Sequence, residues 1–164
     1  MLEELKELNV TTNKMEKPRM LKRDAAPSAS YSTAGSSANC DTMTAACATE
    51  LMNAASSFHK LHLKVKGAGA YAAHKALNDL YDALPDHADT LIEGYQGAAE
   101  KILSYSESAP RTLNTVEEGI AYLRDMYQMV NGLQAKMPYS EIVNSLDTLK
   151  DTINSAKYKL LFLK

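Results

Sequence analysis

The sequence contains no Trp, only two Phe, seven Gly and five Pro among its 164 residues. So few turn-forming residues argue against a sandwich rich in turns, and they favour helices. No apolar run reaches the roughly 18 residues that a transmembrane helix requires. The first ten residues, MLEELKELNV, are charged rather than apolar. We therefore expect neither a membrane span nor a signal peptide, and no membrane partner.

Cysteine is also scarce, since Cys40 and Cys47 are the two present, and they lack a CxxC spacing. We expect two free thiols in a reducing compartment. We therefore expect the chain in the cytoplasm, or inside a particle assembled in a cell. The P-loop, GxSxG, HExxH and ferritin-type ExxH motifs are missing, which disfavours a hydrolase or an NTPase. The net charge of −2 gives no indication of wholesale nucleic-acid binding.

The first 39 residues differ in composition from the remainder of the chain. A basic run from Lys14 to Arg23 is followed by AAPSASYSTAGSSAN, which is rich in Ser, Ala and Gly. Such a segment cannot bury enough apolar surface to fold alone. We expect residues 1–39 to form an extended, low-complexity arm held by a partner or a neighbouring subunit. The basic run, with five positive charges against Glu16 and Asp24, has a net charge of about +3, which would give only weak, salt-sensitive contact with DNA, so docking on protein is favoured.

Residues 40–164 are predicted to form one all-α domain. Apolar residues recur there at spacings of three and four, as on one face of an amphipathic helix. Thr115 and Glu118 match a capping box at the start of the third such segment. Links that are mostly short favour an antiparallel four-helix bundle. The four helices are expected at about 41–66, 70–97, 115–136 and from 138 onwards.

Two histidines interrupt the apolar stripes of the first two predicted helices. His62 and His74 lie at equal distances from the predicted turn near Ala68, so antiparallel packing should set the two imidazoles level with each other. Two facing neutral imidazoles suit a divalent transition metal. A core histidine bonded to a backbone carbonyl is the alternative interpretation of His62.

Three more polar residues share a face with His74 on the second predicted helix, namely Asn78, Asp89 and Glu93. His74 and Asp89 are about 22 Å apart along a helix axis, too far for one ion to join them within a chain. A two-fold axis near residue 82 would bring the histidines of one chain to the carboxylates of another. The pattern therefore predicts a site between subunits, although Asp89 and Glu93 could also be solvated acids.

These residues carry a resemblance to a known family. The Dps group of ferritin-like proteins has a histidine before a Val-Lys-Gly helix end, a second histidine on the next helix, and a distal Asp and Glu pair. The matching segments here are His59-Lys-Leu-His62-Leu-Lys-Val-Lys-Gly67, Tyr71-Ala-Ala-His74-Lys-Ala-Leu-Asn78 and Asp89-Thr-Leu-Ile-Glu93. The wording of these segments is closer still to an uncharacterised Dps-like family encoded by tailed bacteriophages.

The resemblance implies a ferritin-like bundle that assembles through dimers into a hollow dodecamer, with iron, or another divalent metal, bound between subunits. His62, His74, Asp89 and Glu93 would be ligands. Asn78 stands where the family has an acidic ligand, which speaks against iron oxidation because an amide stabilises Fe³⁺ less well. Ferroxidase-type activity is therefore left open. The alternative is a phage virion structural or assembly protein that docks on other virion proteins through residues 1–39.

Overall fold

A computed structural model describes residues 34–163, with side chains from Asn39 onward. The described part of the chain contains four helices and no strand, which confirms the all-α prediction. The helices are α1 (Ala34–His62), α2 (Ala70–Ala99), α3 (Val116–Gln134) and α4 (Ser140–Phe162). Residues 1–33, most of the predicted arm, lie outside the described residues, so the arm stays a prediction.

The boundaries of the helices agree with the sequence pattern to within about two residues except at α1, which ends at His62, four residues before the predicted end, and also begins early. This helix begins at Ala34, seven positions before the predicted start at Asp41. No Pro lies between Pro27 and Pro85, so nothing in the backbone chemistry ends the helix at Asp41. At α3 the predicted capping box is confirmed, because the Thr115 hydroxyl accepts from the Glu118 N–H and the Glu118 carboxylate accepts from the Thr115 N–H.

Each helix packs against two others, in the order α1, α2, α4, α3 and back to α1. Apolar residues that recur at spacings of three and four are buried on α2 and α4, among them Leu77, Leu80 and Leu84 on α2 and Ile142, Leu146 and Leu149 on α4. Close approach is possible at two glycines: a Cβ on Gly94 of α2 would lie 2.8 Å from Ile142 of α4, and a Cβ on Gly119 of α3 would lie 2.8 Å from Leu61 of α1. The core thus extends along all four helices.

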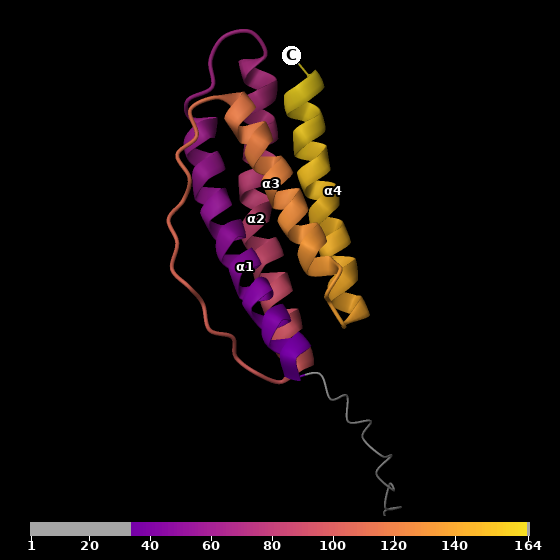
Figure 1. The fold of residues 1–164 in the computed structure, drawn as a ribbon. Helices are drawn as coiled ribbons and strands as arrows, with labels where there is room; N and C mark the ends of the chain where they lie inside the picture. Colours follow the sequence, from indigo (N-terminus) through magenta and orange to yellow (C-terminus); the bar gives the residue numbers. More distant parts are fainter. Residues whose placement is uncertain (1–33, 164) are drawn as a thin grey trace, which may run out of the picture. The chain divides into compact units, whose positions relative to one another are not determined.

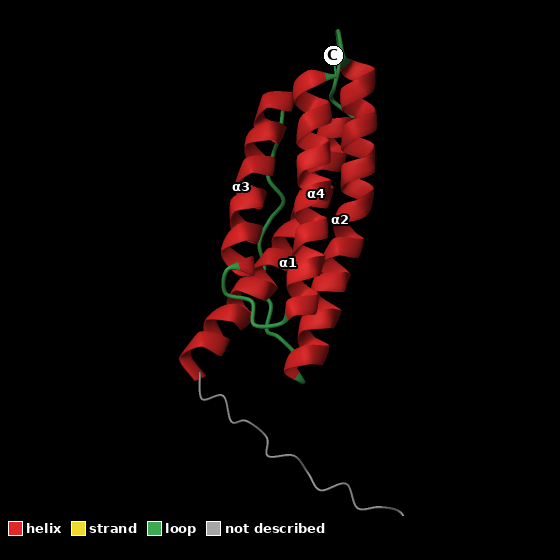
Figure 2. Ribbon diagram, turned by 90° about the vertical axis from the view of Figure 1, so that its right-hand side faces the viewer, coloured by secondary structure: helices red, strands yellow, loops and turns green. Residues whose placement is uncertain are grey.

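The connection between α2 and α3 is the long exception among links that were predicted to be mostly short, and its length agrees with the predicted helix ranges. Residues 100–115, called the crossover below, return along the length of the helices, so that α2 and α3 run in the same direction (Figures 1 and 2). The other two connections are short turns. The crossover has no apolar periodicity from which its course could have been predicted. Among the described residues, no helix is both long enough and apolar enough to cross a lipid bilayer.

Candidate metal centre

The centre of interest is the imidazole pair formed by His62, the last residue of α1, and His74, in the first turns of α2. Their Nε2 atoms are 3.0 Å apart, and their ring centroids are 3.7 Å apart with an interplanar angle of 29°. His62 is 7% exposed, while His74 is half-buried. The structure therefore brings the two histidines together, as their equal distance from the turn predicted.

The hydrogen bonds of the pair fix which ring nitrogens carry protons. His74 Nδ1 lies 3.3 Å from the backbone carbonyl of His62, and a carbonyl can only accept, so this Nδ1 carries a proton. In the neutral ring His74 Nε2 is then an acceptor, and the proton between the two rings belongs to His62 Nε2. His62 Nδ1 is left buried without a hydrogen-bond partner.

Electrostatics favours the neutral form of His62. Burial lowers the pKa of His62 below its usual value of 6.5, and the neighbouring His74 and His59 lower it further, while Asp82 opposes them. Neutral imidazole is the form that binds metal ions. At neutral pH His62 therefore carries no positive charge that would repel a metal ion.

Residues on both helices surround the pair. His59 stacks on the ring of Tyr81 with centroids 4.2 Å apart, and His62 meets the same ring edge-on at 5.2 Å. The Tyr81 hydroxyl donates to Asn78 Oδ1 at 2.9 Å, and Asn78 Nδ2 donates to Asp82 Oδ2 at 2.9 Å. Asn78 is thus engaged within its own helix.

His59, Tyr81 and Asp82 were not among the predicted site residues. The signal that could have found them is their spacing, because His59 lies three residues before His62, and Tyr81 lies seven residues after His74. Both spacings keep side chains on one helix face. A histidine at such a spacing is common on solvated surfaces, so the pattern alone gave no reason to include it.

Asp89 and Glu93, the other predicted ligands, are exposed on α2 and far from the imidazole pair. About 22 Å of helix separates His74 from Asp89. Within the part of the chain that the structure describes, no three His, Cys, Asp or Glu side chains are grouped so that they could hold a metal ion. One chain by itself therefore brings together His62 and His74 but leaves out both carboxylates.

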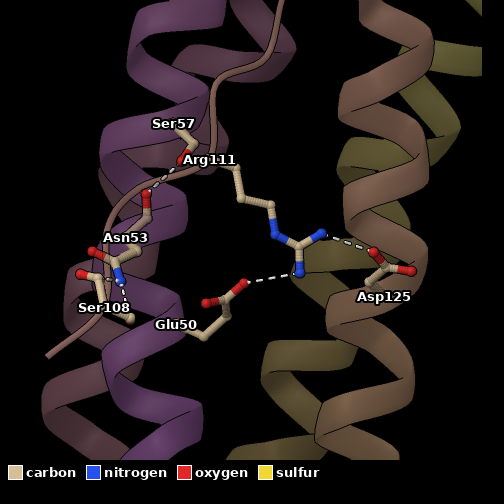
Figure 3. Close-up of polar contacts among 6 residues, drawn as sticks. All are labelled: Glu50, Asn53, Ser57, Ser108, Arg111 and Asp125. Carbon is tan, nitrogen blue, oxygen red and sulfur yellow. Dashed lines mark hydrogen bonds and ion pairs between the residues drawn. The ribbon is translucent and has the colours of Figure 1, made fainter. Parts of the chain in front are cut away.

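A second polar cluster lies where the crossover passes between α1 and α3 (Figure 3). Arg111 lies 3.2 Å from Glu50 of α1, donates to Asp125 of α3 at 2.8 Å, and places its guanidinium 4.0 Å from the centre of the Tyr122 ring. A cavity of about 340 Å³ lies beside these side chains. We call Glu50, Arg111, Tyr122 and Asp125 the Arg111 cluster. Its contacts hold the crossover against α1 and α3.

Comparison with known proteins gives a family but no activity. Over 110 residues the chain is 28% identical to an uncharacterised 14.6 kDa protein from the mobD–ri intergenic region of Enterobacteria phage T4, covering 67% of this chain and 81% of that protein. No solved structure matches the chain. Residues 62–160 match a family of unknown function. The match covers more than half of the sequence and includes His62 through Glu93. The chain therefore belongs to this family, DUF5856.

Proposed function

We propose that the chain is a Dps-like, ferritin-like four-helix bundle that assembles into oligomers and binds a divalent metal between subunits. His62 and His74 of one subunit would hold the ion together with Asp89 and Glu93 of another. The observation that carries this proposal is the pair of imidazoles with Nε2 atoms 3.0 Å apart. The long crossover supports the ferritin-like part, since such folds connect their helices through one long crossover.

The chemistry of the imidazole pair fits a metal ion. Two imidazole nitrogens that each lie about 2.1 Å from one ion, at a right angle, are about 3.0 Å apart. The bond from His74 Nδ1 to the His62 carbonyl, at 3.3 Å, is the kind of outer contact that orients a ligating histidine. An ion would take the place of the proton that His62 Nε2 now shares with His74. When bound, it would supply Lewis acidity at a partly buried position.

The second subunit enters because two nitrogens alone are a poor site for an ion. Asp89 and Glu93 are exposed one turn apart on α2, and both could serve as oxygen ligands. Two antiparallel copies of α2, related by an axis between residues 81 and 82, would bring His74 of one level with Asp89 of the other. A dimer is then the smallest unit with a complete site, and a dodecamer would contain six such dimers.

The position of Asn78 shapes the choice of metal. Its amide is neutral, and its oxygen already accepts a hydrogen bond from Tyr81 at 2.9 Å. The loss of one carboxylate weakens the binding of Fe³⁺ more than the binding of Fe²⁺ or Zn²⁺. We therefore propose binding of a divalent ion, with iron and zinc as the two candidates, and attribute no oxidation step to the chain.

The test is metal uptake by protein that has been stripped with a chelator and dialysed against Zn²⁺ or, without oxygen, Fe²⁺ at pH 7.5. Elemental analysis should find about one ion per subunit, because each dimer has two equivalent sites. His62→Ala and His74→Ala should each abolish uptake. His87→Ala, which removes a histidine that bonds Thr152 on the other side of α2, should not. No uptake by the wild type would overturn the proposal.

Mixing two defective variants shows whether the site lies between subunits. His74→Ala lacks a nitrogen ligand, and the double variant Asp89→Asn/Glu93→Gln lacks the carboxylates. A mixed dimer contains one site with both defects and one intact site, so random mixing should restore about a quarter of the sites. No restoration, with the subunits shown to exchange, would mean that the ligands do not come from two subunits.

The second candidate is a virion structural or assembly protein that docks on other virion proteins through residues 1–39. The phage origin of the similar T4 protein supports it. The family match begins at residue 62, so whatever the first 39 residues do would be additional to the shared part of the family. A purified oligomer that takes up no metal in the experiment above would favour this candidate.

A further inference from the structure

A groove lies at the end of the bundle where α1 turns into α2 and where α4 ends (Figure 1). It encloses about 540 Å³ and is lined by the turn before α2, the start of α3 and the last residues of α4. Among its lining residues Leu61, Ile120 and Leu160 are buried, and Val65 and Val116 are half-buried. We call this cavity the end groove. Its size is within the range of about 300–1,000 Å³ that is typical of ligand sites.

The surroundings of the end groove favour an occupant with one apolar face and some negative charge. Leu163, which lines the groove, is 45% exposed, and its neighbour Phe162 is 68% exposed. Exposed apolar side chains beside a cavity are typical of a contact surface. The charged residues of the lining are Lys64, Lys66 and Glu117. Lys64 donates to two neutral acceptors of the crossover, which leave its positive charge available to a ligand.

The beginning of the chain, outside the described residues, has the matching chemistry. Residues 2–8 alternate leucines with acids, as Leu2, Leu5 and Leu8 with Glu3, Glu4 and Glu7. On a helix the leucines would fall within an arc of about 120°, with the glutamates on the other side. An amphipathic segment of this kind binds by laying its apolar face into a groove.

The other residues that precede α1 fit the end groove less well. The run from Lys14 to Arg23 is basic, so the lysines of the groove would repel it. Residues 24–33 contain no Leu, Ile, Val, Met or Phe that could fill an apolar cavity. Residues 2–8 are therefore the segment that the groove selects by both shape and charge.

We infer that residues 2–8 of one copy of the chain fill the end groove of a neighbouring copy. Helix α1 begins at the opposite end of the bundle, about 41 Å along the helix axis from Leu61 (Figure 1). The groove of the same copy thus lies behind the start of α1, whereas the groove of a copy placed against that start lies ahead of it. Residues 9–33 span up to about 80 Å when extended, which is ample for this contact. The inference goes beyond the proposed function, because the imidazole pair takes no part in it.

Binding of a fluorescent peptide with the sequence of residues 1–10 tests the occupant. The receptor is the full chain with Leu2, Leu5 and Leu8 changed to serine, so that its own first residues do not compete. With a chelator present, fluorescence anisotropy should detect binding that weakens several-fold between about 0.05 M and 0.5 M NaCl, because salt screens the ionic contacts. A peptide with the same three serines should bind at least about tenfold more weakly.

Two further changes to the receptor locate the peptide. Val116→Glu puts a carboxylate in the lining of the groove, and it should weaken binding by about tenfold or more. An acid is favourable in the first turn of a helix, so α3 should be kept. Ile102→Glu is the matched control, at an 83% exposed residue at the other end of the bundle. No binding to the unmodified groove, or equal binding to these two receptors, would mean that residues 2–8 are not its occupant.

Cysteine crosslinking between two variants shows which copy supplies the segment. Asn9→Cys and Leu163→Cys, one of them with a mass tag, are refolded together and treated with diamide, an oxidant of thiols. A disulfide-linked heterodimer should form, and Ile102→Cys in place of Leu163→Cys should give none. The native Cys40 and Cys47 are buried and should not compete. The inference fails if no heterodimer forms, or if the double variant Asn9→Cys/Leu163→Cys closes its disulfide within a single chain.

Discussion

The two connections at the ends of α2 are built in different ways. Before α2, the turn at residues 63–69 is closed by its own backbone, with Lys64 N–H bonded to the Leu61 carbonyl and Ala70 N–H to the Gly67 carbonyl. After α2, residues 102–114 of the crossover make no backbone–backbone hydrogen bond with any residue from 34 to 163. Side chains hold them instead. The turn is thus specified locally, while the crossover depends on residues far away in the sequence.

The side chains that hold the crossover come from α1, α2, α3 and, at Lys64, the turn before α2. Asn53 and Lys64 donate to the Ser108 and Leu113 carbonyls, and Gln96 accepts from the Leu103 N–H. Arg111 of the crossover forms ion pairs with two helices, through Glu50 of α1 and Asp125 of α3. We therefore expect the crossover to be weakened most by a change at Arg111, and the turn by a change at a glycine.

The largest effect is expected from Arg111→Met, which keeps the aliphatic stem but removes the guanidinium. Two ion pairs and the contact with the Tyr122 ring are lost together. Partly exposed ion pairs contribute little each, and a cation–π contact adds about 1 kcal/mol, so the free energy of unfolding should fall by about 2 kcal/mol. Urea denaturation followed by circular dichroism measures this loss.

Arg124→Met is the matched control for that experiment. Arg124 is an exposed arginine on the same helix as Asp125, and this change should alter the free energy of unfolding by less than about 0.5 kcal/mol. Arg111→Lys should recover only part of the loss, because an ammonium group cannot bridge two carboxylates and stack on a ring in the same way. Equal losses at 111 and 124 would show that the Arg111 cluster does not hold the crossover.

The same contrast explains how much of the molecule could be predicted. Helix α2 follows from apolar spacing, and the pairing of His62 with His74 follows from their equal distance from the turn near Ala68; both signals are local. The course of the crossover could not be found that way, because it is decided by pairs such as Arg111 and Glu50 that are distant in sequence. The early start of α1 was missed because Ala34 to Asn39 carry no apolar pattern. The contacts of Asn78 with Tyr81 and Asp82 depend on rotamers, which no sequence pattern specifies.

Glycine substitutions should separate the turn from the helix that follows it. Gly67 has φ 87°, where an alanine is strained although no atom lies within 4 Å of its Cβ. Gly67→Ala should therefore lower the free energy of unfolding by about 1 kcal/mol. Gly97, inside α2, also has open space, and Gly97→Ala should raise it by about 0.5–1 kcal/mol because alanine favours the helix.

Thermal denaturation of the two variants checks these opposite signs. Gly67→Asn should cost less than Gly67→Ala, since asparagine tolerates positive φ better than alanine does. If Gly67→Ala and Gly97→Ala shifted the midpoint in the same direction, the backbone conformation of the turn would not be what sets its stability.

The smallest effect expected is a dependence of the free energy of unfolding on pH. It arises from His62, beside the turn, and not from the crossover. Burial and two neighbouring histidines lower the pKa of His62, so the unfolded chain, with a histidine pKa near 6.5, binds a proton more readily than the folded one. Stability from this group is complete above about pH 6.5 and falls as the pH drops towards the lowered pKa. The pKa of the half-buried His87 is also lowered by desolvation, so His87 contributes with the same sign.

Denaturation with urea at about pH 7.5 and pH 5.5, in the presence of a chelator, measures this slope. His62→Gln should reduce the loss on acidification but leave the part that His87 contributes. Arg111→Met should be less stable at both pH values with the slope of the wild type, because the pKa of Arg111 is raised by Asp125 and its charge does not change in this range. A wild-type slope in His62→Gln would mean that His62 titrates alike in the folded and unfolded chain, and hence that the imidazole pair is not packed as described. If Arg111→Met changed this slope, the crossover would influence the pKa of His62. The turn before α2 and the crossover after it would then not be independent of each other.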